Sequence, residues 1–432
     1  MNTPKVNKRI LALDILRGFT IAGMILVNNP GSWGYIYAPL RHAEWNGLTP
    51  TDLVFPFFMF IMGISTYISL KKYNFEFSQS AAIKILKRTI VIFLIGCAIG
   101  WFSRFCRYWV SAPEDLSFFE NLWASVWTFD RMRILGVMQR LALCYGAASI
   151  VALTVKHKRI PYIIATLLVG YFVILMCGNG YEYNETNILS VVDRTILTPI
   201  HMYQDNGIDP EGILSTIPAI AHVLLGFYVG KLMLDGNQSQ DRMSFLNSQI
   251  ITLFLVGTVL TFAGFLLSYG CPINKKIWSP TFVLTTCGLA SSFLALLIWI
   301  IDVKGKKKWS LFFEAFGVNP LFMYVLGGVL GILFGCISFP WEEGMISIHT
   351  FLYKIVLVPV FGQTGGSLAY ALLFVTINWC VGSVGVTGFV SVGVGFGVGL
   401  LHETSITTPI KALKKIKTLF FKAFINTLLQ FR

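Results

Sequence analysis

The sequence has little charge and lacks the patterns of several common enzyme classes. Charged residues make up 13% of the 432 residues, about half of the ~25% that is usual in soluble proteins. The eight cysteines include no CxxC pair and the six histidines form no ligand-spaced pair, so we expect neither a disulfide framework nor a metal site. P-loop, GxSxG and HExxH patterns are absent as well, which argues against ATP-driven, serine-hydrolase and zinc-protease chemistry.

Apolar residues are abundant instead. They make up 55% of the chain, and the mean hydropathy is +0.68. Runs of this length predict an all-α polytopic membrane bundle of about ten transmembrane helices, because a helix satisfies its own backbone hydrogen bonds in lipid. The first run contains charged residues and no small-residue cleavage site, so we interpret it as a retained span. The expected spans are residues 10–28, 52–70, 83–102, 134–155, 161–178, 213–234, 249–269, 280–301, 310–336 and 367–390.

The positive charge indicates orientation rather than nucleic-acid binding. The formal net charge is +13, but the basic residues form short clusters between the apolar runs. If the N-terminus is cytoplasmic, most lysines and arginines fall on the cytoplasmic side, as the positive-inside rule requires, and both termini are then cytoplasmic. We expect a transmembrane domain over 1–400 and a basic amphipathic cytoplasmic tail over 401–432, with the lipid bilayer as partner.

The stretch Leu40–Gly63 joins a polar loop to an apolar helix. Its loop carries His42, and an imidazole can take up a proton near neutral pH or accept an acyl group. A purely structural histidine is the alternative. The spacing from Thr49 to Asp52, with a proline between them, is typical of a helix capping box. Asp52 is therefore expected to cap the helix, which would also hold the loop in a fixed register.

Ionisable side chains also fall inside the expected spans. Asp14 and Arg17 lie three residues apart on one face of the first span. Arg133 and Arg140 are seven residues apart at the start of the fourth, with Gln139 beside them. Because charge is costly in a membrane, we expect these groups to face a common polar cavity, where an arginine could bind a phosphate. An ion pair within the first span, or between the arginines and Asp14, is the structural alternative.

Further polar markers lie near span ends. Asp209-Pro-Glu-Gly212 immediately precedes the sixth span, and Asn319-Pro320 interrupts the ninth. A proline inside a helix removes a backbone hydrogen bond, so the ninth span is expected to break at that point.

Several motifs occur together in a fixed order along the chain. They are Leu13-Asp14-Ile15-Leu16-Arg17-Gly18, Val27-Asn28, His42-Ala43-x-Trp45-Asn46-Gly47-x-Thr49-x-x-Asp52-Leu53-Val54-Phe55-Pro56, Arg133-Ile134-x-Gly136-Val137-x-Gln139-Arg140 and Asp209-Pro210-Glu211-Gly212. In this order they resemble the heparan-α-glucosaminide N-acetyltransferase family of transmembrane acyltransferases. The resemblance covers roughly residues 8–380, and its most specific part is the block from His42 to Pro56.

The resemblance implies a reaction and the role of one histidine, and the other roles given below are our own expectations. It implies transfer of acetyl from cytosolic acetyl-CoA to the amine of a terminal glucosamine, of heparan type or in another amino sugar, on the far side of the membrane. The catalytic histidine of the family falls on His42. Asn46 or Asn28 is expected to stabilise the oxyanion, with Asp52 and Asp14 orienting the polar network. The residues expected to bind the acetyl-CoA co-substrate are Asp14, Arg17, Arg133, Gln139 and Arg140.

Departures from the family pattern and rival functions stay open. Leu135 stands where the family usually has proline. The short N-terminal segment predicts a compact relative in the bacterial inner membrane, with the His42 loop facing the periplasm. One rival is a transporter that uses the buried charges as a path, and another is an O-acyltransferase of a cell-envelope glycan. A homodimer is an open alternative to a monomer.

Overall fold

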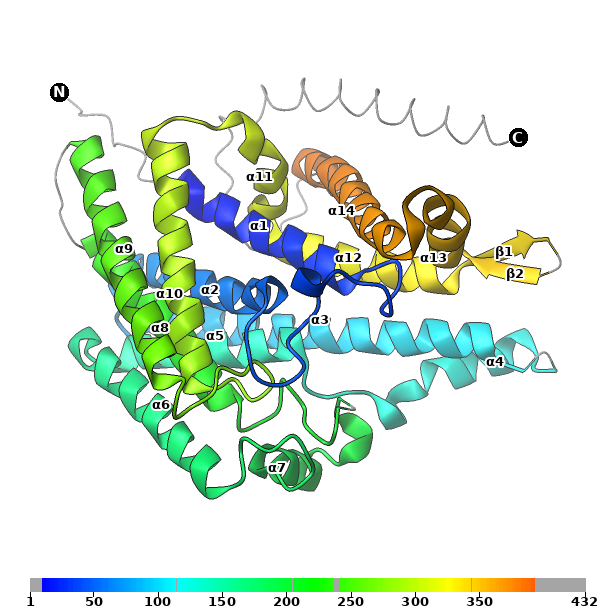
Figure 1. Ribbon diagram of the computed structural model, residues 1–432, viewed down its shortest axis with the longest axis horizontal. Helices are drawn as coiled ribbons and strands as arrows, with labels where there is room; N and C mark the ends of the chain where they lie inside the picture. The colour runs from blue at the N-terminus through cyan, green and yellow to red at the C-terminus, as the bar shows by residue number, and fades with distance from the viewer. Residues whose placement is uncertain (1–9, 114, 204, 236–240, 343, 393–432) are drawn as a thin grey trace.

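The computed structural model describes residues 10–113, 115–203, 205–235, 241–342 and 344–392 (Figure 1). The expected basic tail over 401–432 therefore lies outside the described residues. So does the boundary that we placed near residue 400.

The described chain is built almost entirely of helices. Short 3-10 turns at η1, Ala38–Leu40, and η2, Pro50–Leu53, flank the His42 loop, and the π-helical segments are η6, Ile298–Val303, and η8, Phe351–Leu357. Two short strands, β1 (Ser338–Trp341) and β2 (Gly344–Ser347), pair antiparallel. The α-helices are α1 (Leu11–Asn28), α2 (Val54–Lys71), α3 (Gln79–Ser111), α4 (Phe118–Val126), α5 (Val137–Thr154), α6 (Ile160–Cys177), α7 (Ile188–Ile196), α8 (Thr216–Asp235), α9 (Arg242–Leu267), α10 (Pro280–Leu297), α11 (Leu311–Val318), α12 (Pro320–Cys336), α13 (Ile348–Thr350) and α14 (Val358–Val392).

The helices confirm the all-α membrane class that the composition predicts. Among the described residues, eight helices are long and apolar enough to cross a membrane, or up to nine if a bent pair is one span. Nine of the ten expected segments overlap these candidate spans, with 310–336 on the bent pair, whereas 83–102 lies within α3, which has 33 residues and is not among them. In Figure 1, α6, α8, α9 and α10 gather at one end of the molecule, and α4 and the strand pair lie at the other.

The bent pair confirms the break predicted at Asn319-Pro320. Helices α11 and α12 meet there at an angle of 81°. The Asn319 side chain accepts a hydrogen bond from the backbone N–H of Phe322, so it caps the second helix. Proline supplies no N–H of its own, and its fixed backbone angle suits the first turn of that helix.

Close contact between α2 and α8 depends on glycine. A Cβ atom placed on Gly63 would lie 2.2 Å from the carbonyl oxygen of Val223, and one placed on Gly226 would lie 2.3 Å from the carbonyl oxygen of Phe60. Small residues allow two helix backbones to approach in this way in membrane proteins. Because α2 follows directly from the loop that carries His42, this crossing also positions that loop.

We expect Gly63→Ala to destabilise the protein by about 1–3 kcal/mol, since the added methyl group must push two packed backbones apart. Thermal unfolding of the purified protein in detergent measures this effect. Gly170→Ala in α6 is the matched control, because a Cβ atom there meets nothing within 4 Å. An equal loss of stability in the two variants would contradict the packing argument.

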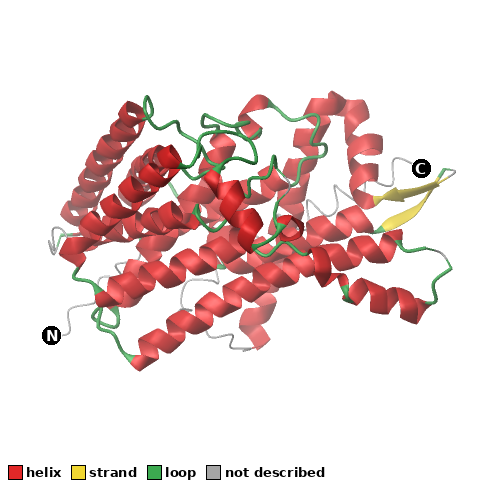
Figure 2. Ribbon diagram, turned by 90° about the horizontal axis from the view of Figure 1, so that it is seen from below, coloured by secondary structure: helices red, strands yellow, loops and turns green. Residues whose placement is uncertain are grey.

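The loops that join the helices gather mainly on one side of the bundle (Figure 2). The segment between α1 and α2, the segment around α7, and the turn between α9 and α10 meet there through hydrogen bonds such as Gly47 N–H to Ile273 O, at 2.8 Å. Polar side chains from distant parts of the chain are therefore brought together at this face.

Candidate active site

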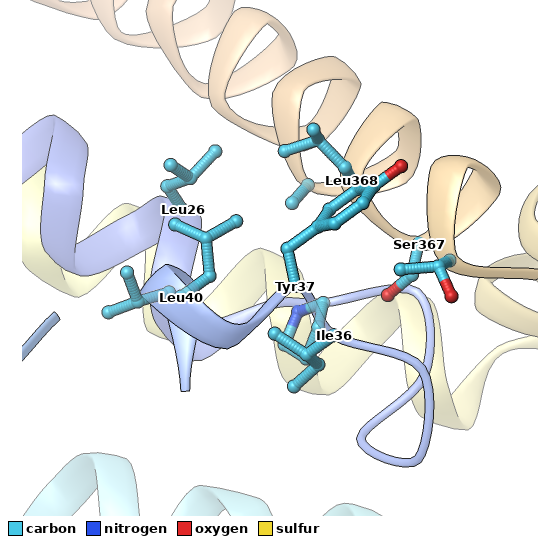
Figure 3. A pocket seen from close by; sticks show the side chains of 10 residues that line it. Leu26, Ile36, Tyr37, Leu40, Ser367 and Leu368 are labelled. Atoms are coloured by element: carbon cyan, nitrogen blue, oxygen red, sulfur yellow. The ribbon is translucent and has the colours of Figure 1, made fainter. Parts of the chain in front are cut away.

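The segment that precedes His42 is anchored on α14. The backbone N–H of Gly31 donates to the carbonyl oxygen of Ser367 at 3.2 Å, and the N–H of Ser32 donates to the Ser367 hydroxyl at 3.0 Å. Tyr37 lies beside Leu368 at a small, largely apolar recess between α1, η1 and α14 (Figure 3). These contacts fix the start of the loop against the bundle.

Asp52 holds the other end of the loop. The predicted capping box is confirmed, because the Thr49 and Asp52 side chains both bond to the facing backbone. The Asp52 carboxylate also accepts from the N–H of Ala43 at 3.1 Å and from the Thr49 hydroxyl at 2.9 Å. Asp52 is fully buried. A buried carboxylate surrounded only by donors is a strong acceptor, so it determines how the His42 loop folds.

His42 is oriented by the same carboxylate. Its Nδ1 lies 2.6 Å from Asp52 Oδ1, while 44% of the imidazole side chain is exposed. Because the carboxylate can only accept, Nδ1 carries the proton that it donates. The lone pair is then on Nε2, which is the atom left to take a proton from a substrate. The structure thus brings together His42 and Asp52 in the arrangement of a base and its orienting group.

Lys275 completes this cluster, and our sequence analysis did not assign it. Its Nζ lies 3.0 Å from His42 Nδ1, 3.4 Å from His42 Nε2 and 3.4 Å from Asp52 Oδ1. Burial lowers the pKa of Lys275, although the charges of Asp52 and Glu211 oppose that shift. One signal was available in the sequence: Lys275 and Lys276 are paired lysines in a loop that the orientation argument places outside, where the positive-inside rule disfavours them.

Asn46 and Asn28 occupy different environments. Asn46 accepts a hydrogen bond from the Asn274 amide at 3.1 Å, so it joins the His42 loop to the loop that carries Lys275. Asn28 is exposed at the end of α1. Among the described residues, no hydrogen bond links either asparagine to the His42 imidazole. Their expected oxyanion role is not tested by this arrangement.

The Asp209-Pro-Glu-Gly212 motif binds Arg133. The guanidinium forms an ion pair with Asp209 and contacts Glu211 Oε2 at 2.6 Å. Burial alone would raise the pKa of Glu211, but Arg133, followed by Arg140, holds it below the ordinary value. Asp209 also accepts backbone hydrogen bonds from Tyr203 at 2.9 Å and from Glu211 at 3.0 Å. Arg133 is thus engaged by two carboxylates of its own protein.

Arg140 and Gln139 have partners close by, although Nε and Nη1 of Arg140 are buried without a hydrogen-bond partner among the described residues. Arg140 is 1% exposed, donates to Ser215 and to the carbonyl oxygen of Gly212, and lies over the ring of Trp278. The Gln139 amide contacts the sulfur of Cys97 on α3 at 3.6 Å. Helix α5 begins at Val137. Leu135, which stands where the family usually has proline, lies two residues before this helix.

Asp14 and Arg17 form a separate pair near the start of α1. Arg17 Nη1 lies 2.9 Å from Asp14 Oδ1, and Arg17 Nη2 donates to the Ser65 hydroxyl on α2 at 2.8 Å. The structural alternative within the first span is therefore present. The alternative pairing of Asp14 with Arg133 and Arg140 is not found among the described residues, because residues 209–215 supply the partners of both arginines.

Asp193, next to this arginine cluster, is expected to make stability depend on pH. Burial raises its pKa to about 6 from 3.8. The folded state thus favours the protonated Asp193 carboxyl. The stabilisation from this group is complete when the pH is below its unfolded pKa of 3.8, and it is lost as the pH rises through about 6. We expect thermal stability in detergent to fall over this range, by ~3 kcal/mol at most. Asp193→Asn should flatten the dependence, and an unchanged pH slope would contradict the assignment.

These features define a polytopic helical membrane protein with a His-Asp-Lys cluster in the loops at one side of its bundle. Residues 9–266 match the model of the family described as heparan-alpha-glucosaminide N-acetyltransferase, catalytic. The chain belongs to this family. The match covers more than half of the chain and includes His42, Asp52 and the Arg133 motif.

Two curated relatives carry the name heparan-alpha-glucosaminide N-acetyltransferase. The human protein is 27% identical over 372 residues, which are 73% of this chain and 52% of the human protein. The mouse protein is 27% identical over 391 residues, which are 77% of this chain and 55% of the mouse protein. The chain thus spans about half the length of the curated relatives it matches.

Proposed function

We propose that this protein is a membrane acetyltransferase that transfers acetyl from acetyl-CoA to the amine of a terminal glucosamine or a related amino sugar. The observation that carries the proposal is the hydrogen bond from His42 Nδ1 to the buried Asp52, which leaves the lone pair on Nε2 of a side chain that is 44% exposed. Membership of the N-acetyltransferase family supports the choice of reaction. A bilayer-spanning body suits a donor and an acceptor on opposite sides.

In the reaction, the acceptor amine attacks the thioester carbonyl of acetyl-CoA. A C–N bond forms, the C–S bond breaks, and coenzyme A leaves as its thiol. His42 Nε2 takes the proton that the amine must lose, and Asp52 stabilises the imidazolium that results. Lys275 lies beside the imidazole. In its protonated form it would stabilise the negative charge that develops on the oxygen of the thioester carbonyl.

A covalent route uses the same residues. In that case Nε2 of His42 attacks the thioester first, and the acetylimidazole then reacts with the acceptor amine. Asp52 has the same orienting role in both routes. Acetyl that is retained on His42 without acceptor, and that hydroxylamine removes, would support the covalent route.

The proposal also includes an oxyanion donor, a membrane location and a set of residues that bind acetyl-CoA. Asn46 lies on the His42 loop and is a candidate for the oxyanion donor, as is Asn28 at the end of α1. We place the protein in a bacterial inner membrane, with the His42 loop facing the periplasm and acetyl-CoA supplied from the cytoplasm. The proposed acetyl-CoA-binding set remains Asp14, Arg17, Arg133, Gln139 and Arg140.

One assay tests the proposed function. Purified protein in detergent is incubated with radiolabelled acetyl-CoA and a glucosaminide, and labelled N-acetyl product is measured. A parallel reaction with a hydroxyl-only glycan tests the O-acyltransferase alternative. If no product forms with any amino sugar and a solute crosses the membrane of proteoliposomes that contain the protein, the protein is a transporter and not an acetyltransferase.

A further inference from the structure

A primary amine of the protein itself lies at the candidate active site. Lys275 Nζ is within 3.4 Å of both ring nitrogens of His42. The acceptor in the proposed function is also a primary amine, and its nitrogen must come within hydrogen-bond distance of Nε2 to lose its proton. Lys275 therefore occupies the kind of position that the acceptor amine has to reach.

The neighbouring lysine does not share this position. Lys276 Nζ lies 2.8 Å from Asp205 and 2.7 Å from the Tyr183 hydroxyl. Both groups favour its charged form, so the pKa of Lys276 is raised, although burial opposes the shift. For Lys275, burial outweighs the attraction of Asp52, and the pKa is lowered. The uncharged amine needed for nucleophilic attack is thus more accessible at Lys275 than at Lys276.

We propose that Lys275 is a self-acetylation site, which receives the acetyl group when acetyl-CoA is bound and no acceptor sugar is present. This inference rests on the proposed function, because it uses the same donor and the same base. A side chain held beside the reacting group has the advantage of an intramolecular reaction. Acetylation removes the charge that contacts Asp52, so it also changes the environment of His42.

The step balances without any further reactant. The Nζ of Lys275 attacks the thioester carbonyl, a C–N bond forms, and the C–S bond breaks. His42 accepts the proton from the uncharged Nζ and passes it to the departing sulfur, so coenzyme A leaves as its thiol. The product is a lysine amide, which resists hydroxylamine, whereas an acetylimidazole on His42 does not.

The test uses the full chain in detergent with acetyl-CoA alone. After proteolysis, mass spectrometry measures acetyl occupancy at Lys275 in the wild type, Lys276→Arg and His42→Ala. Exposed Lys72 reports uncatalysed acetylation. We expect occupancy at Lys275 to exceed that at Lys72 by at least ~10-fold, to persist in Lys276→Arg, to resist hydroxylamine and to fall to the level of Lys72 in His42→Ala.

A glucosaminide assay on the same preparations separates the two proposals. If the wild type acetylates the sugar while Lys275 shows no more label than Lys72, self-acetylation is wrong and the proposed function stands. The same conclusion follows if Lys275 is labelled equally in the wild type and in His42→Ala. If neither the sugar nor Lys275 is acetylated, both proposals fail. Adding the sugar to an active preparation should lower Lys275 labelling by competition, and unchanged labelling would contradict a shared site.

Discussion

His42→Ala is expected to lower kcat/KM for acetyl transfer to a glucosaminide by about 10²–10⁴-fold, the range that a positioned general base contributes. The loss is expected because Nδ1 of His42 donates to Asp52, so Nε2 carries the lone pair that accepts the proton of the substrate. The side chain is 44% exposed, so its removal should leave the fold intact. Rates of labelled product formation, measured beside thermal unfolding in detergent, check both parts of the expectation.

The control for this variant is another histidine, which lies in the short helix α13. His349 contacts the carbonyl oxygen of Pro30 at 3.4 Å and has no carboxylate partner among the described contacts. We expect His349→Ala to keep most of the activity. Equal losses in the two variants, or a His42→Ala protein with unaltered kcat/KM, would remove His42 from the reaction.

Asp52→Asn is expected to cause the second large loss, on the order of 10²–10⁴-fold in kcat. The carboxylate accepts from His42, from two backbone N–H groups and from the Thr49 hydroxyl. An amide has one acceptor oxygen and an NH₂ group, which would face donors. His42 could then satisfy that NH₂ only with its proton moved to Nε2, which removes the base.

Stability measurements separate this effect from loss of the cap. Asp52→Asn should also cost about 1–3 kcal/mol of stability, since buried donors lose their partner. Thr49→Ala removes one hydroxyl donor from the same carboxylate and leaves the His42 contact in place, so it should lower stability with little change in kcat. If Thr49→Ala lowers kcat as much as Asp52→Asn, the carboxylate acts only by holding the loop.

Asp52 shows how far sequence patterns reach at this site. The spacing from Thr49 predicts the cap correctly, because a capping box depends on residues only three positions apart. The partnership of Asp52 with His42 depends on the path of the loop between them. A local pattern does not report that path, so the sequence predicted an orienting role for Asp52 in general, and the direct contact with His42 Nδ1 came from the folded chain.

Lys275 was missed for a related reason. It contacts His42 across 233 positions of sequence, and no periodic pattern connects residues so far apart. Arg133 shows a second limit of sequence patterns. Its seven-residue spacing from Arg140 suggested one shared face, but Arg133 lies before α5, which begins at Val137. Its partners Asp209 and Glu211 come from a distant segment, which spacing along the chain does not report.

The sequence by itself determined the helical membrane class, because long apolar runs have few ways to satisfy their backbone in lipid. It also determined the break at Pro320 and the cap at Asp52, which depend on residues adjacent in the chain. Only the tertiary structure decided which charges meet. Loops from distant helices come together at the His42 side, and their ion pairs form across space, so chain order could not place Lys275 beside His42.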